Sequence, residues 1–289
     1  MPVSLPFRRV TAEEIKEQRD EHYHRRAGLR LQRAEDAARF VDEVGFCLLF
    51  PARGIELPSL WEAVNGCERP LPRRHHDRAL SLTWDWKDSL PTRGRVYYGK
   101  LLKQKPTFVS LAMFPYFYAL SGNYGELEDY LGEYADGKMS EEAKRIYEVL
   151  LTQGASTTGV LRREAGLYGK MLASRFDRAI AELQASLKII KTGISNANRW
   201  KYCYVYDVLI RRLPAEVERA KQIRGREAMR VIVEKLLETV VVATPSRIAW
   251  LFGWDSAVTQ RLIDGLVENG PLMRVEWEGA EAVTLARLW

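Results

Sequence analysis

Apolar and polar residues in the C-terminal half of the chain follow a pattern whose period changes in a fixed order. From Ser140, a suitable helix N-cap, apolar side chains recur every three or four residues until Gly154, which predicts an amphipathic helix. A short helix and then a longer one are expected as far as residue 187. The pattern then alternates, so residues 188–192 and 200–206 are predicted to form a β-hairpin.

The same order recurs nearer the C-terminus. A helix expected over residues 226–242 precedes Thr244 and Pro245, which favour an N-cap followed by proline at the first helical position. A short helix, a longer helix and two strands complete the repeat. Helix, short helix, longer helix and hairpin is the order of a winged helix-turn-helix unit, so the repetition predicts two such units, at residues 139–213 and 226–289.

The N-terminal half is less regular. We expect a polar helix over residues 11–26, an amphipathic helix over residues 34–44, and a helical pattern broken by prolines over residues 101–134. The predicted domains here are an N-terminal helical extension, residues 1–33, and a degenerate first winged-helix-like unit with a helical connector, residues 34–138. The predicted fold class is mainly α with small β wings (α+β), built from tandem winged helix-turn-helix units, three if this half supplies one.

Composition and charge narrow the class of protein. Hydrophobic residues make up 46% and charged residues 28% of the 289 positions, as in an ordinary globular protein. The net charge of +6 favours a polyanionic partner without proving one. Three scattered cysteines predict neither a disulfide framework nor a metal site, and we expect no cofactor. With no signal peptide and no stretch able to span a bilayer, a cytoplasmic protein without a membrane partner is expected.

The unit at residues 139–213 carries the basic residues that a winged helix uses on DNA. Its third helix would enter the major groove and its hairpin would lie over the backbone. The expected DNA-binding residues are Lys170, Arg175 and Arg178 on the helix and Lys188, Lys191 and Lys201 on the hairpin. The alternative is a solvated helix face. The unit at residues 226–289 has an acidic wing and is expected to pack and not to bind DNA.

A second basic cluster contains Arg73 and Arg74, with Trp84 and Trp86 further along the chain. Arginines interleaved with aromatic rings suit a nucleic-acid surface. An equal alternative is that the tryptophans alternate in a strand or pack beneath the arginines.

Acid–base side chains are densest around His75, Asp85 and Asp88. Adjacent residues point in different directions, so spacing alone makes none of them a catalytic pair. These three residues are weak catalytic candidates.

Three runs, residues 80–88, 98–102 and 114–118, together with the tandem winged helices, resemble the winged-helix DNA-binding superfamily that includes the bacterial crosslink-unhooking, azinomycin-resistance type DNA glycosylases. The resemblance covers about residues 34–289 and rests on overall order. It implies three tandem winged helices around double-stranded DNA, intact or damaged.

The resemblance also implies where the chemistry should lie. Characterised members carry a Gln-x-Gln or Gln-x-Asp pair in a short strand after an early helix and glycine, where it positions water and stabilises charge on the sugar. The matching positions here are Leu48 and Phe50, whose apolar side chains can do neither. Our first hypothesis is a DNA-binding protein of this glycosylase-like family without base-excision chemistry. The alternatives are an active glycosylase that removes alkylated or crosslinked bases with other groups, such as Asp85 or Asp88, and a winged-helix transcriptional regulator.

Overall fold

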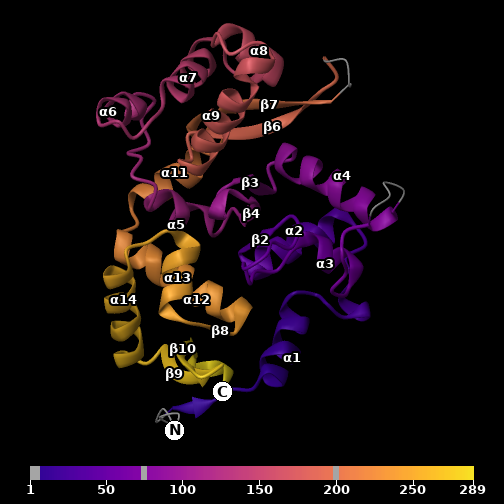
Figure 1. Cartoon of the computed structure of the whole chain (residues 1–289), viewed down its shortest axis with the longest axis vertical. Helices are drawn as coiled ribbons and strands as arrows, with labels where there is room; N and C mark the ends of the chain where they lie inside the picture. The colour runs from indigo at the N-terminus through magenta and orange to yellow at the C-terminus, as the bar shows by residue number, and fades with distance from the viewer. Residues whose placement is uncertain (1–6, 73–76, 198–201) are drawn as a thin grey trace. The chain divides into compact units, whose positions relative to one another are not determined.

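The computed structural model describes residues 7–72, 77–197 and 202–289, and the chain divides into two compact units (Figure 1). The first unit joins residues 1–83 to residues 225–289, and the second comprises residues 84–224. Both combine helices with small sheets, which confirms the predicted mainly helical α+β class. None of the described helices is both long and apolar enough to cross a membrane.

The first unit begins with elements whose starts are marked by capping residues. They are β1 (Arg8–Arg9), α1 (Ala12–His22), α2 (Ala34–Val44), β2 (Phe46–Leu48) and α3 (Leu60–Asn65). Thr11 and Glu14 form a reciprocal capping box at the start of α1. The Ser59 side chain accepts the N–H of Glu62 at the start of α3. Local sequence therefore determines where these helices begin.

The C-terminal part of the first unit has the predicted order of elements. It contains α12 (Gly225–Val240), β8 (Val242–Ala243), α13 (Pro245–Phe252), α14 (Ser256–Glu268), β9 (Leu272–Trp277) and β10 (Ala280–Leu285). Thr244 caps α13, with proline at its first position, as expected. Strands β9 and β10 form a hairpin, β10 pairs with β8, and the N-terminal β1 adds a parallel strand beside β9. Val10 and Ile15 thereby pack against buried residues of this sheet.

The second unit is built around two hairpins. It contains most of α4 (Arg78–Thr92), then β3 (Val96–Lys100), β4 (Pro106–Ser110), α5 (Phe114–Ala119), α6 (Asp129–Ala135), α7 (Glu141–Gln153), β5 (Ser156–Thr157), α8 (Thr158–Glu164), α9 (Ala173–Ala185), β6 (Ile189–Ser195), β7 (Cys203–Val208), α10 (Leu209–Arg212) and α11 (Pro214–Lys221). Helices α7, α8 and α9 enclose a core that includes Leu150, Phe176 and Leu183. Strand β7 pairs with both β5 and β6.

One expectation for the middle of the chain, and one of the alternatives left open there, are wrong. Residues 106–110, expected within a helical pattern, form β4, which pairs with β3 along its whole length. A short apolar run fits a strand or a helix equally well, and here the partner strand decides. Trp84 and Trp86 lie in α4 and not in a strand; Trp86 is buried and Trp84 is exposed.

The order helix, short strand, helix, helix and hairpin occurs three times along the described chain, from α2 to β4, from α7 to β7 and from α12 to β10. In the two C-terminal repeats the strands also have the same spatial order, β5-β7-β6 and β8-β10-β9. The element order predicted for these repeats is confirmed. The predicted domain boundaries, and the assignment of three winged helices, stay predictions.

Candidate functional site

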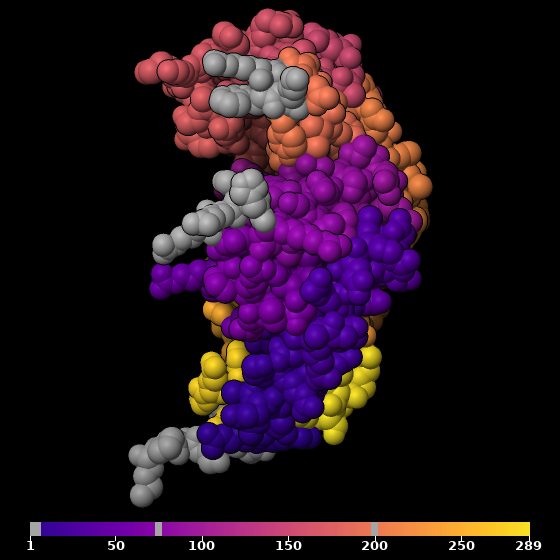
Figure 2. All heavy atoms as spheres, turned by 90° about the vertical axis from the view of Figure 1, so that its right-hand side faces the viewer, coloured from indigo at the N-terminus to yellow at the C-terminus, as the bar shows by residue number. Residues whose placement is uncertain are grey.

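The predicted DNA-binding residues around α9 lie at the surface of the second unit. Figure 2 shows the segment from α8 to α9, pink at the top of the view, on the exterior. Arg175 and Arg178 lie away from the buried stripe of α9 and are exposed, as is Lys170 just before the helix. Arg175 has an ion pair with Glu142, 3.5 Å between Nη1 and Oε1. Such a solvated pair is weak, so these three cations are available to a ligand.

The two predicted hairpin contacts that the structure describes are buried. Lys188 lies 2.8 Å from Glu133, an ion pair whose angles do not suit a hydrogen bond. Lys191 lies in β6 and donates a hydrogen bond to Asp88. Lysines already paired inside the unit are poorly placed to bind phosphates at the surface. The geometry therefore favours the cations of α9 over these two lysines.

Lys191 belongs to a group that we call the lysine–tyrosine cluster, formed by Lys87, Asp88, Lys191, Tyr202 and Tyr204. Its two lysines are buried, whereas Tyr202 is 41% exposed. Lys87 Nζ donates to the hydroxyls of Tyr202 (2.6 Å) and Tyr204 (2.8 Å) and lies 2.8 Å from Asp88 Oδ1. The Tyr202 hydroxyl donates to Asp88 Oδ2 at 2.9 Å. Both oxygens of Asp88 are therefore engaged, and the cluster fastens the β6–β7 hairpin to α4.

The lysine–tyrosine cluster has more positive than negative charge. Two ammonium groups share one carboxylate, and the Lys87 and Lys191 side chains are only 1% and 3% exposed. Aromatic rings compensate in part, since Lys191 Nζ lies 4.0 Å from the centre of the Tyr204 ring. Burial, followed by repulsion from Lys87, lowers the pKa of Lys191 to about 8, although Asp88 opposes this shift. Burial also raises the pKa of Tyr202, so this hydroxyl stays a donor.

Sequence reasoning did not identify Lys87, Tyr202 or Tyr204 as members of a cluster. A signal was present, because Tyr202, Tyr204 and Tyr206 alternate along the predicted strand and so share one face. Their partner on α4 was not deducible, since it lies more than a hundred residues away, with Lys87 and Tyr202 separated by 115 positions.

The positions matched to the family's catalytic pair lie in the first unit, and of the two only Leu48 belongs to its core. Leu48 is 0% exposed, and its N–H donates to the Pro58 carbonyl at 2.9 Å. Phe50 is half-buried, with its ring centre 6.2 Å from that of Trp61. Neither side chain offers a polar group for orienting water.

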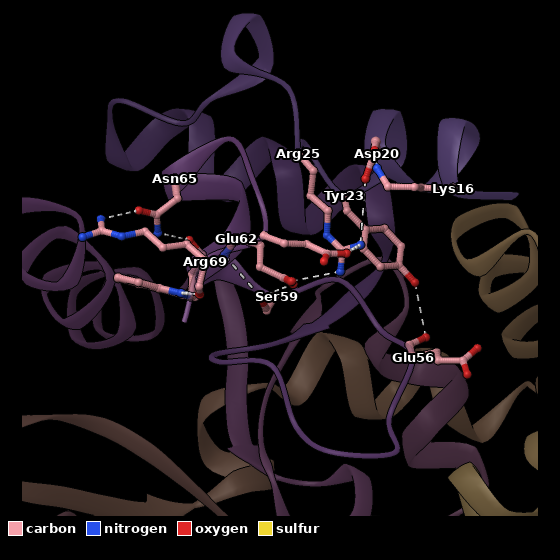
Figure 3. Close-up of polar contacts among 11 residues, drawn as sticks. Lys16, Asp20, Tyr23, Arg25, Glu56, Ser59, Glu62, Asn65 and Arg69 are labelled. Carbon is pink, nitrogen blue, oxygen red and sulfur yellow. Dashed lines mark hydrogen bonds and ion pairs between the residues drawn. The ribbon is translucent and has the colours of Figure 1, made fainter. Parts of the chain in front are cut away.

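A buried carboxylate that sequence reasoning missed lies in the same unit (Figure 3). Glu62 accepts hydrogen bonds from the Ser59 hydroxyl at 2.6 Å and from Arg25 Nη2 at 2.9 Å. Burial raises the pKa of Glu62, and the two donors act in the opposite direction. Arg25 also pairs with Glu68 at 2.6 Å. Because both Glu62 oxygens are engaged, this network ties Arg25, just after α1, to α3. The Ser-x-x-Glu spacing of a capping box was its signal.

Four predicted site residues, Arg73, Arg74, His75 and Lys201, lie outside the described residues. Of the neighbouring groups that are described, Arg69 pairs with Asp77 at 2.6 Å. Asp85 is exposed on α4. All the assignments of DNA-binding and catalytic residues stay predictions.

The chain is similar to one protein family and to one solved structure. A family described as AlkZ related matches residues 31–253. Comparison with curated proteins gave no match. Among solved structures, the fold is similar to that of the Streptomyces sahachiroi DNA glycosylase AlkZ, with a TM-score of 0.58, 13% identity, and coverage of 96% of this chain and 71% of that chain. At this identity the similarity concerns the fold, and it confirms the resemblance drawn from the sequence. Since the family match spans well over half of the chain, the protein belongs to the AlkZ-related family.

Proposed function

We propose that the protein binds double-stranded DNA through α9 and does not excise bases. The observation that carries the proposal is the exposed basic face formed by Lys170, Arg175 and Arg178. This face lies on the third helix of a repeat whose order is that of a winged helix, the helix that such units place in the major groove. The two arginines and the lysine there can all reach phosphates, contacts that supply affinity but carry little sequence information.

The fold and the charge support this partner. The protein of similar fold is named a DNA glycosylase, so its ligand is DNA. The net charge of +6 favours attraction to a polyanion over the whole surface. We expect binding to depend strongly on salt and weakly on sequence, in contrast to a regulator that selects one site, and we place the protein in the cytoplasm.

The absence of excision chemistry is inferred from the groups that could supply it. Hydrolysis of a glycosidic bond needs a group that orients water and a charge that stabilises the developing cation on the sugar. Leu48 and Phe50 provide neither. The carboxylates of Asp88 and Glu62 already accept hydrogen bonds on both oxygens. A carboxylate so engaged is a poor base for a catalytic water.

The test of DNA binding compares wild type with the double variant Arg175→Ala and Arg178→Ala, using fluorescence anisotropy on a short mixed-sequence duplex over a series of salt concentrations. We expect the variant to bind about 10- to 100-fold more weakly. The slope of the logarithm of the binding constant against the logarithm of the salt concentration should become shallower by about two. Arg145→Ala is the matched control, because it removes an exposed arginine from α7 of the same unit. Unchanged binding by the double variant would refute the role of α9.

Excision is tested separately on alkylated duplex DNA, by chromatography of released bases. We expect no release above the rate without protein. Release that depends on the protein would refute the second half of the proposal.

A further inference from the structure

The turn between α8 and α9 exposes two large apolar side chains. Tyr168 is 76% and Met171 is 90% exposed. Single exposed apolar residues are common on protein surfaces and need no explanation. Here two of them lie three positions apart on one turn, immediately before the helix that carries the basic face.

Hydrogen bonds on both sides, together with burial of the Leu167 side chain, hold the backbone of this turn. The Leu167 N–H donates to the Arg162 carbonyl at 2.7 Å, and the Leu167 side chain is buried. On the other side, the Leu172 N–H donates to the Gly169 carbonyl at 3.3 Å. Gly169 has φ 103°, a conformation that side-chain-bearing residues rarely adopt, so glycine suits this position. The two side chains are therefore presented by a fixed backbone.

The surroundings of the pair favour a polyanion with an apolar interior. Lys170 lies between Tyr168 and Met171 in sequence and is exposed, and Arg175 and Arg178 follow on α9. A protein partner that covered the apolar pair would also have to neutralise these cations. In DNA, phosphates flank stacked bases, so one ligand satisfies both the charge and the apolar surface.

We propose that Tyr168 and Met171 form a wedge that enters the base stack of duplex DNA, and that the preferred ligand is a duplex from which a base is missing. This inference rests on the proposed DNA binding and adds the class of DNA that is bound. Apolar side chains of this kind open base steps, and tyrosine can stack on an exposed base. Entry costs least where a base is already absent, because less stacking has to be broken.

The experiment measures the affinity of the whole chain for two duplexes of identical sequence, one intact and one with a tetrahydrofuran abasic analogue. The quantity of interest is the ratio of the two dissociation constants. Because a stacked base contributes a factor of about 5 to 100 in affinity, wild type should prefer the abasic duplex by a factor in that range. In Tyr168→Ala with Met171→Ala the ratio should fall to near one, with affinity for intact duplex almost unchanged.

Two matched variants separate the wedge from general loss of surface. Tyr124→Ala removes a tyrosine that is 78% exposed elsewhere in the same unit and should leave the ratio unchanged. Met171→Leu keeps an apolar side chain of similar volume and should keep most of the preference. A 2-aminopurine opposite the abasic analogue should brighten when wild type unstacks it and should not respond to the double variant.

The outcomes are distinguishable from failure of DNA binding itself. Equal binding of both duplexes by wild type overturns the wedge and leaves the proposed function standing. A preference that survives in the double variant also overturns it, and assigns the exposed pair to another partner, such as a protein. Binding of neither duplex overturns both proposals.

Discussion

Replacing Lys191 by methionine should stabilise the protein at neutral pH, although it removes an ion pair. The lysine–tyrosine cluster places two buried ammonium groups against the single carboxylate of Asp88. Methionine keeps an unbranched apolar chain in the same space and leaves Asp88 with Lys87 and Tyr202 as partners. Replacing a buried charge by an apolar group of similar shape is often neutral or stabilising.

The magnitude follows from the pKa of Lys191, which falls from an ordinary value of 10.5 to about 8 in the folded protein. Between these two pKa values the unfolded chain binds more protons at this lysine than the folded protein does. The free energy of unfolding therefore rises with pH across this window, and the gain is lost as pH falls through about 8. The whole shift corresponds to roughly 3 kcal/mol, of which about 1.5 kcal/mol is recovered between about pH 8 and about pH 9.5. Above about pH 10 tyrosines ionise in the unfolded chain and reverse the trend, because burial raises the pKa of tyrosines such as Tyr97 in the folded protein.

The assay is urea unfolding of wild type and Lys191→Met, followed by circular dichroism at several pH values from about 7 to about 9.5. The variant should be more stable by about 1–3 kcal/mol at the low end, and the difference should shrink as pH rises. Lys188→Met is the control, because among the described residues Lys188 is the cation paired with Glu133, and its loss should destabilise the protein throughout this pH range. If Lys191→Met is the less stable protein at neutral pH, the ammonium contributes net stability and the reasoning is wrong.

Two further predictions concern the first unit. The double variant Leu48→Gln with Phe50→Gln introduces the side chains of the family's pair. Because Leu48 lies in a closed core, we expect the free energy of unfolding in urea to fall by about 2–4 kcal/mol, with no base release. Recovery of excision would show that these positions face a ligand. Arg25→Ala leaves the buried Glu62 carboxylate without its cation and should lower the free energy of unfolding by about 3 kcal/mol near neutral pH. The loss should be smaller in the double variant Arg25→Ala with Glu62→Gln, and equal losses in both variants would contradict a stabilising ion pair.

Sequence predicted best the features that neighbouring residues determine. Thr11, Ser59 and Thr244 each cap a helix, and such a cap can be read from sequence because its hydrogen bond closes within three residues. The order of elements in the two C-terminal repeats followed from the same local signals. The parallel strand β1 gave no such signal, since its partner β9 lies at the opposite end of the chain.

Charge was the least predictable property of the candidate site. Lys188 and Lys191 were expected to face phosphates because the hairpin of a winged helix does so, but whether a particular lysine faces outward depends on what packs against the strand. Asp88 meets Lys191 across 103 positions, and Glu133 meets Lys188 from a separate helix. No window of sequence contains both partners, so their burial could be established only from the fold.

The second unit therefore departs from the ordinary distribution of residues in two opposite ways. Lysines, which are usually exposed to water, are buried near the β6–β7 hairpin. A tyrosine and a methionine, which are more often buried, are exposed just before α9. Folding stability alone explains neither, because a buried excess charge and an exposed apolar pair both carry a cost in free energy. Lys87 and Lys191 fix the hairpin to α4 through Asp88, in the same unit as the exposed pair. A turn whose backbone is already fixed favours insertion of a side chain into an opened base step, because less conformational entropy is lost when the protein binds.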